Sequence, residues 1–246
     1  FGPSAIAGAI NFITDIDYTN SYSVNGFLFQ NHIRNNSIDT NYSKITDNGW
    51  HLNLKGSTTQ SKTNSSIAKG NEDDSAKNFQ INLNGIKWIN DELKFKSTFY
   101  SRKTKADYDG SATDEKGYVS NNKMYALQSG FEHKSKNYED SLIFHYHNYD
   151  REYDNATYLD EYDSESFVIK GERSIKTNNK ISFGYGSEYK YDWGAFENRG
   201  SYTASTKGHM KNFGLFANAG YKINENQILS IYGRSDDHNT TSRNQT

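Results

Sequence analysis

The chain opens with its most informative stretch, Phe1-Gly2-Pro3-Ser4-Ala5-Ile6-Ala7-Gly8-Ala9-Ile10-Asn11-Phe12-Ile13-Thr14. Small residues alternate with aliphatic ones, and an apolar pair precedes the final Thr. Gly2 and Gly8 permit a left-handed backbone or a close backbone approach. The run that follows Gly8 is nearly continuous in apolar residues, as in a strand covered on both faces. The stretch therefore predicts a tight Gly-Pro entry followed by a buried strand.

The composition is polar overall but rich in aromatic residues. The chain has 246 residues, a formal charge of −2, no cysteine, 33% hydrophobic residues and 15% aromatic residues. Disordered chains are poor in aromatics, and soluble domains usually carry more Leu, Ile and Val. A membrane β-barrel has this profile, because only every second strand residue meets lipid and tyrosines gird both interfaces. The near-neutral charge gives no support for a nucleic-acid partner, and no apolar run is long enough for a membrane-spanning helix.

From residue 21 onward, apolar side chains recur at every second position. Trp50, Leu52 and Leu54 alternate with polar residues, as do Phe79, Ile81 and Leu83. This is the period of a β-strand with one apolar face. We expect about eleven such strands, at residues 21–31, 36–46, 49–60, 77–89, 92–103, 124–134, 138–149, 164–175, 180–191, 210–222 and 227–237.

The connections between the expected strands alternate in length. Short turns lie near residues 47–49, 90–92, 134–137, 177–179 and 224–226, and longer polar segments lie at 61–76, 103–123, 150–163 and 192–209. Short turns on one side and long loops on the other are typical of outer-membrane barrels. Transporter barrels close at about 22 strands around a plug, so about eleven strands are half a barrel. Half a barrel leaves two open edges in lipid, and we expect the chain to be a fragment that does not function alone.

The opening stretch resembles the motif that closes the plug domain of TonB-dependent outer-membrane receptors, an aromatic-Gly-x-x-Ala-x-x-Gly-x-Ile-Asn-x-x-Thr pattern. The matching positions are Gly2, Ala5, Gly8, Asn11 and Thr14. The resemblance implies that residues 1–17 are the end of a plug domain and that 18–246 are the N-terminal half of the barrel. The predicted fold is thus all-β, an antiparallel up-and-down transmembrane barrel fragment preceded by the last strand of a plug.

Three further stretches resemble the cobalamin (vitamin B12) receptor branch of this family: Asn71–Asn78, Tyr125–Asp154 and Gly233–His238. The Arg-x-Asp segment in the last of these is also shared by siderophore receptors. The resemblance implies an active transporter in the outer membrane of a Gram-negative bacterium. Its substrate would be a scarce, bulky nutrient, with cobalamin or another corrinoid first and a ferric siderophore or haem second.

The same resemblance implies partners. One is the energy-transducing complex of TonB, ExbB and ExbD, which an upstream segment would contact. The other is the lipid of the outer membrane. The alternative from another class is a passive porin or a β-barrel adhesin without a plug. No nucleophile elbow, phosphate loop or cysteine site is present in the sequence, and we predict no enzymatic activity.

Two acidic segments are candidate calcium sites. Gly70–Asp74 precedes the fourth expected strand and Asp107–Gly110 follows the fifth, so the two loops are neighbours in an up-and-down barrel. Calcium takes several carboxylate and carbonyl oxygens, whereas the alternative is an ordinary solvated acidic loop. In cobalamin receptors aspartates of these loops bind calcium, and the resemblance implies as ligands Asp73, Asp74, Asp107 and Asp109. The family often has Asp-Gly-aromatic where this chain has Asp74-Ser75-Ala76, which weakens the match.

Tyrosines gather in and beside the long connections. Their amphipathic rings suit a bulky, partly apolar ligand, although an interfacial girdle is the alternative role. The candidate ligand-binding residues are Tyr108, Tyr153, Tyr158 and Tyr162. His145 and His147 share one strand face, where we expect a polar pair facing the lumen in preference to a metal site.

Overall fold

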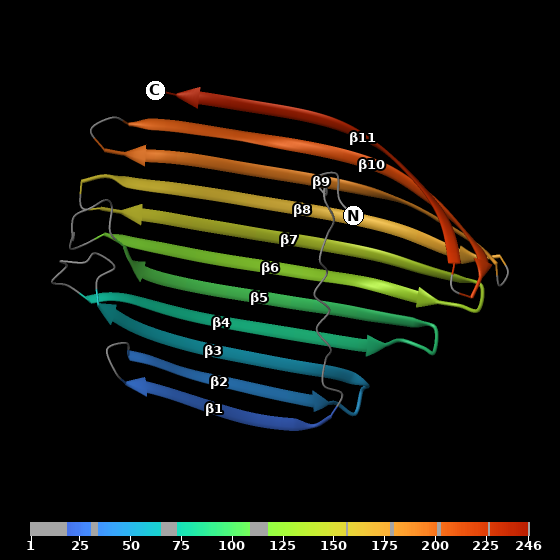
Figure 1. Ribbon diagram of the computed structural model, residues 1–246, viewed down its shortest axis with the longest axis horizontal. Helices are drawn as coiled ribbons and strands as arrows, with labels where there is room; N and C mark the ends of the chain where they lie inside the picture. Colours follow the sequence, from blue (N-terminus) through green and yellow to red (C-terminus); the bar gives the residue numbers. More distant parts are fainter. Residues whose placement is uncertain are drawn as a thin grey trace.

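The computed structural model describes residues 19–30, 34–64, 73–108, 118–155, 157–177, 180–200, 203–225 and 227–245. These residues form one sheet of eleven antiparallel strands, each paired with its neighbours in sequence (Figure 1). The strands are β1 (Ser21–Gln30), β2 (Arg34–Ile45), β3 (Trp50–Asn64), β4 (Asp73–Trp88), β5 (Leu93–Asp107), β6 (Val119–Lys134), β7 (Tyr138–Asp154), β8 (Leu159–Lys176), β9 (Ile181–Arg199), β10 (Ala204–Asn224) and β11 (Gln227–Gln245).

The predicted all-β, up-and-down fold is confirmed over this part of the chain. The described residues contain no helix that is long and apolar enough to span a membrane. The predicted plug motif lies outside the described residues, at Gly2, Ala5, Gly8, Asn11 and Thr14.

The strand register gives the sheet one apolar and one polar face. Leu54 lies opposite Leu83, Leu83 opposite Phe99, and Phe99 opposite Leu127. The row continues across β7 and β8 as Tyr146 and Phe167. Because successive side chains of a strand point to opposite faces, the polar residues between these positions share the other face. The period-two pattern of the sequence thus becomes a continuous apolar surface.

No described protein layer covers the apolar face. Among the described residues, Ile86 is the only buried apolar side chain, at 5% exposed. Leu83, Phe131 and Leu142 are instead 45%, 43% and 51% exposed. A soluble domain buries such a face against a second layer, whereas the outer wall of a membrane barrel presents it to lipid.

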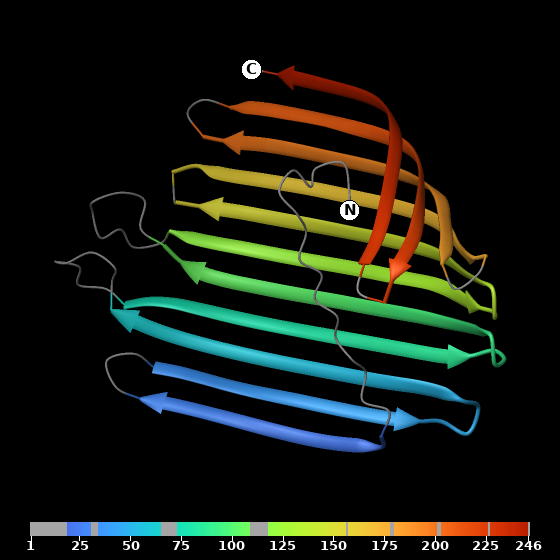
Figure 2. The same ribbon diagram turned by 45° about the vertical axis from the view of Figure 1, so that its right-hand side comes forward.

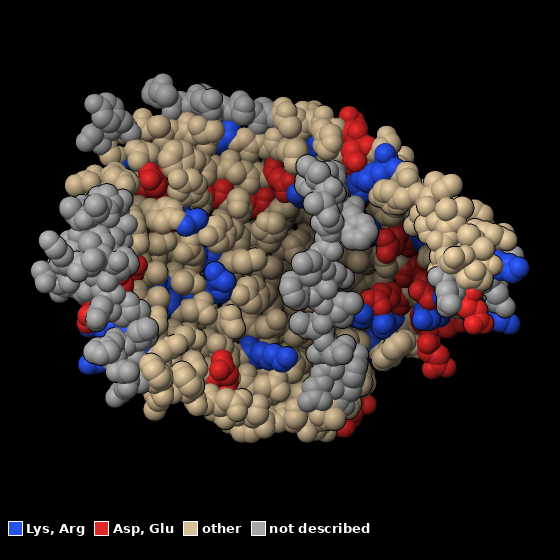
Figure 3. Space-filling view, in the orientation of Figure 1, with Lys and Arg blue, Asp and Glu red and all other residues tan. Residues whose placement is uncertain are grey.

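The polar face is the inner side of the curved sheet. In Figure 2 the ends of β10 and β11 bend over the face that is turned to the viewer. Figure 3 shows this face, with Lys, Arg, Asp and Glu side chains spread across the middle of the sheet. A curved sheet with polar residues inside is typical of a barrel with a polar lumen.

The strands extend further than expected on one side of the sheet. We call this side, where β5 connects to β6 and β7 to β8, the loop edge; it is on the left in Figure 1. The expected long loop at 150–163 is wrong in extent, because β7 ends at Asp154 and β8 begins at Leu159. Likewise β9 runs to Arg199 and β10 begins at Ala204. In these strand ends polar residues lie on both faces, so the sequence shows no alternation although the backbones stay paired.

The opposite side, the turn edge, carries short connections as expected. Between β2 and β3 the amide of Gly49 donates to the carbonyl of Thr46 at 2.9 Å. Gly49 has a φ of 75°, a left-handed conformation that glycine adopts without a steric cost. Tight turns of this kind fix the register of the strands that they join.

Candidate functional site

A row of aromatic side chains crosses the polar face at the loop edge, and we call it the aromatic row. Tyr108 follows β5, Tyr118 precedes β6, and the other rings come from β7, β8 and β9. The ring centroids of Tyr108 and Tyr118 are 5.5 Å apart, and those of Tyr108 and Tyr153 are also 5.5 Å apart. Tyr162 lies 6.2 Å from Tyr153 and 4.7 Å from Phe196. These separations are those of interacting aromatic pairs, so the five rings form a continuous surface.

Polar groups accompany the aromatic row. The guanidinium of Arg151 lies 4.3 Å from the centroid of the Tyr153 ring, within cation–π range. The Arg151 Nε is buried and has no hydrogen-bond partner among the described residues. Nearby, the Tyr149 hydroxyl donates to Asn122 Oδ1 at 2.9 Å. The row therefore combines flat apolar surface with a cation and hydroxyl groups, a mixture typical of small-molecule sites.

The turn between β7 and β8 holds Tyr158 beside this row. Asn155 is 4% exposed, and its Oδ1 accepts from the amides of Thr157 and Tyr158 at 3.0 and 2.8 Å. The Asn155 amide in turn donates to the carbonyl of Tyr158 at 3.2 Å. An Asn side chain that bonds to backbone amides two and three residues ahead stabilises a tight turn. From the sequence alone this turn could not be predicted, because turn propensity does not distinguish Asn155 from the other polar residues of the loop.

Burial raises the pKa of the Tyr108 hydroxyl above its usual value, and the nearby Tyr158, Asp160 and Asp154 raise it further. The hydroxyl is therefore protonated at all physiological pH values and is available as a hydrogen-bond donor. The four tyrosines predicted as ligand-binding residues thus lie together at the loop edge. Phe196 and Arg151 were missed, because only the strand register brings them to the same place.

The predicted calcium ligands that the structure describes have other partners. Asp73 pairs with Lys62 at 2.8 Å. Asp107 accepts from the amide and the hydroxyl of Ser75, at 3.0 and 2.6 Å. Asp74 is adjacent to Asp73 and so points to the other face of β4, and Asp109 lies outside the described residues. The calcium site stays a prediction, and calcium would compete there with partners that Asp73 and Asp107 already have.

The two histidines lie together on the polar face. The ring centroids of His145 and His147 are 5.6 Å apart. The described residues contain no group of three or more His, Cys, Asp or Glu side chains that could hold a metal ion. The two imidazoles thus share the polar face of β7, where they were expected.

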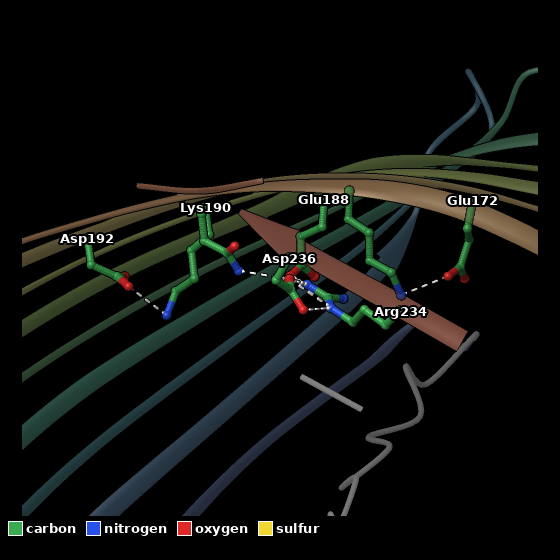
Figure 4. Close-up of polar contacts among 8 residues, drawn as sticks. Glu172, Glu188, Lys190, Asp192, Arg234 and Asp236 are labelled. Atoms are coloured by element: carbon green, nitrogen blue, oxygen red, sulfur yellow. Dashed lines mark hydrogen bonds and ion pairs between the residues drawn. The ribbon is translucent and has the colours of Figure 1, made fainter. Parts of the chain in front are cut away.

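A charged network occupies the polar face further from the loop edge, across β8 to β11 (Figure 4). Arg234 Nη2 lies 2.8 Å from Glu188 Oε1, and Arg234 Nε donates to Asp236 Oδ2 at 2.9 Å. Asn212 Nδ2 donates to Asp236 Oδ1 at 3.2 Å. The Arg234 side chain is only 10% exposed. Lys190 with Asp192 and Lys170 with Glu172 form ion pairs at 2.8 and 2.7 Å beside it.

Comparison with known proteins supports the fold of the chain. No protein-family model matches the sequence, and no curated protein matches it. Among solved structures, the outer-membrane transporter YddB from Escherichia coli matches with a TM-score of 0.66 at 11% identity, over 86% of this chain and 36% of that one. The ferric citrate transporter FecA, in its unliganded form, matches with a TM-score of 0.67 at 11% identity and the same coverages, 86% and 36%.

The siderophore receptor PiuA from Acinetobacter baumannii gives a TM-score of 0.56 at 11% identity, over 90% of this chain and 46% of that one. The chain thus spans less than half the length of each of these proteins. At this level of identity the likeness concerns the fold alone. The eleven-stranded sheet has the architecture of part of an outer-membrane transporter barrel.

Proposed function

We propose that this chain is part of a TonB-dependent outer-membrane receptor that binds a scarce, bulky nutrient at its loop edge and imports it. The aromatic row is the observation that carries the proposal. The architecture shared with outer-membrane transporters supports it, as does the resemblance of the opening stretch to a plug motif. In this proposal the energy comes from the complex of TonB, ExbB and ExbD, and the nutrient passes through the lumen that the polar face lines.

The chemistry of the aromatic row suits a metal chelate with a flat, partly apolar body. Rings spaced at about 5–6 Å offer stacking surface, and the Arg151 guanidinium and the Tyr108 hydroxyl offer polar contacts to its rim. A ferric siderophore is one candidate, since FecA and PiuA are by name a ferric citrate transporter and a siderophore receptor. A corrinoid is the other, because Tyr125–Asp154, which contains Tyr153 and Arg151, resembles the cobalamin receptors.

Ligand binding to outer-membrane vesicles that contain the full gene product tests this proposal. The ligands are labelled cyanocobalamin, a panel of ferric siderophores, and haem. Tyr153→Ala and Tyr162→Ala should each weaken binding of the cognate ligand about tenfold, because each removes one stacking surface. Tyr125→Ala is the matched control, since Tyr125 is 43% exposed and lies on the apolar face, opposite Ser101.

The outcomes separate the candidates. Tight binding of cyanocobalamin supports a corrinoid receptor, and binding of an iron chelate supports a siderophore or haem receptor. Binding that Tyr153→Ala and Tyr162→Ala leave unchanged would remove the aromatic row from the site. No binding of any ligand would contradict the receptor and favour the porin or adhesin.

We also propose that calcium orders the loop edge through Asp73, Asp74, Asp107 and Asp109. The acidic loops and their resemblance to those of cobalamin receptors support this. Removing calcium with a chelator should then weaken nutrient binding, and added calcium should restore it. Affinity that does not respond to the chelator would contradict the calcium site and leave the substrate assignment intact.

A further inference from the structure

A group of lysines lies on the apolar face at the loop edge. Lys77 of β4 lies directly opposite Lys105 of β5, and Lys103 of β5 lies directly opposite Lys123 of β6. They share the apolar face with Phe79, because Phe79 lies opposite Lys103. We call Lys77, Lys103 and Lys105 the lysine patch.

The three lysines of the patch are exposed. Among the described residues, no ion pair involves any of them, whereas the neighbouring Lys62 pairs with Asp73 at 2.8 Å. Lys123 is different, since Asp150 lies opposite it on β7. Like charges directly opposite each other on two strands are destabilising. An external anion would relieve this repulsion.

The position of the patch indicates which anion fits. The row of Ile81, Ser101 and Tyr125 is the next same-face row toward the middle of the sheet. Same-face residues of a strand are about 7 Å apart, so the patch begins at the rim of the apolar surface. In a membrane this rim lies at the level of the lipid headgroups, where lysine ammonium groups collect anionic lipids.

We propose that the lysine patch binds the headgroup of an anionic lipid that carries at least two phosphate groups, in the leaflet on the loop-edge side. Two rows of the sheet contribute lysines, so two phosphates can each meet a separate ammonium group. The acyl chains of the same lipid then lie against the apolar side chains further down the face, such as Phe79 and Leu83. This surface is on the opposite face of the sheet from the aromatic row, and the proposal is independent of the nutrient.

Lipid binding to the purified full gene product in detergent tests this inference. The probes are diphosphoryl lipid A, monophosphoryl lipid A as the matched lipid with one phosphate fewer, and pyrophosphate as the lipid-free diphosphate. Bound lipid is counted by native mass spectrometry. The triple variant Lys77→Gln, Lys103→Gln and Lys105→Gln should bind diphosphoryl lipid A more weakly by a factor on the order of one hundred.

A second triple variant, Lys44→Gln, Lys207→Gln and Lys211→Gln, is the control. These exposed lysines lie on the same face, and none of them lies opposite another lysine. Lys44 lies opposite Leu52, Lys211 opposite Tyr191 and Asn239, and Lys207 opposite Ala195 and Arg243. The control makes the same change of charge and should bind as the unmodified protein does. All six side chains are exposed, so we expect both variants to fold.

Several results would overturn the inference. They are equal binding by the patch variant and the unmodified protein, an equal loss in the control, and equal affinity for the two lipids. Displacement of the lipid by an equal concentration of pyrophosphate would assign the patch to free phosphate and would also overturn it. Nutrient binding by the patch variant should stay unchanged, which separates this test from that of the receptor.

Discussion

Gly214 lies at the centre of the charged network on the polar face. It lies opposite Glu188 on β9 and opposite Asp236 on β11. A Cβ atom at this position would come within 2.5 Å of Arg234 Nη2 and 2.6 Å of Asp236 Oδ1. Such distances are too short for any contact between these atoms, so the ion pairs occupy the space that glycine leaves open. A glycine within a strand lowers stability in itself, but at position 214 it leaves the space in which the ion pairs form.

Gly214→Ala should therefore displace the ends of the Arg234 and Asp236 side chains and lower the free energy of unfolding by about 1 kcal/mol, the low end of the usual cost of overpacking, because these flexible ends can move. Gly233→Ala is the matched control on β11, because a Cβ there meets nothing within 4 Å. Urea unfolding of the full gene product in lipid vesicles measures both. Equal unfolding midpoints for the two variants would mean that the network tolerates the extra methyl group.

The strand interiors were predictable from the sequence, while their outer ends and the site partners were not. Leu54 and Leu83 show the alternation that defines a strand, and the structure confirms it. In a membrane barrel the strand ends that project beyond the lipid meet polar surroundings on both faces, and the ends near Arg199 and Ala204 have no periodic signal. Glu188 is 46 residues from Arg234 in the sequence, and only the register of β9, β10 and β11 brings the two side chains together.

The pairing of β6 with β7 depends on another glycine. A Cβ on Gly130 would lie 2.5 Å from the carbonyl oxygen of Leu142 and 3.3 Å from the Cα of Ile143. Both atoms belong to the backbone of β7, which the hydrogen-bonded ladder holds in place. Unlike the side-chain tips near Gly214, they cannot rotate away.

Gly130→Ala should therefore force the two strands apart, at a cost of about 1–3 kcal/mol. Amide hydrogen exchange of residues 141–144 should speed up relative to the rest of β7. Gly26→Ala on β1, where a Cβ meets nothing within 4 Å, should leave exchange unchanged. If β7 exchanges at the same rate in both variants, the close approach of the strands is not needed for their pairing.

For the molecule as a whole, a membrane barrel and a soluble fold assign different surroundings to the apolar face of the sheet. The described sheet lacks an apolar core apart from Ile86, so its apolar face must meet lipid or another protein layer. If the apolar face meets lipid, each strand has one face toward the lipid and the other toward the lumen. The register then predicts for each side chain which of the two it meets.

These 246 residues contain no cysteine, so an introduced cysteine is the one site in them that takes a nitroxide label, and any cysteine elsewhere in the full gene product is first replaced by serine. Labels at Leu83→Cys and Leu127→Cys on the apolar face should collide more often with oxygen, which concentrates in lipid, than labels at their neighbours Asn82→Cys and Gln128→Cys. Collision rates are measured by power-saturation electron paramagnetic resonance on the full gene product in lipid vesicles. Equal rates within each pair would show that the apolar face does not meet lipid, which would contradict the barrel and favour a second protein layer. A consistent difference, repeated with period two along β4 and β6, is the result that a membrane-spanning barrel wall requires.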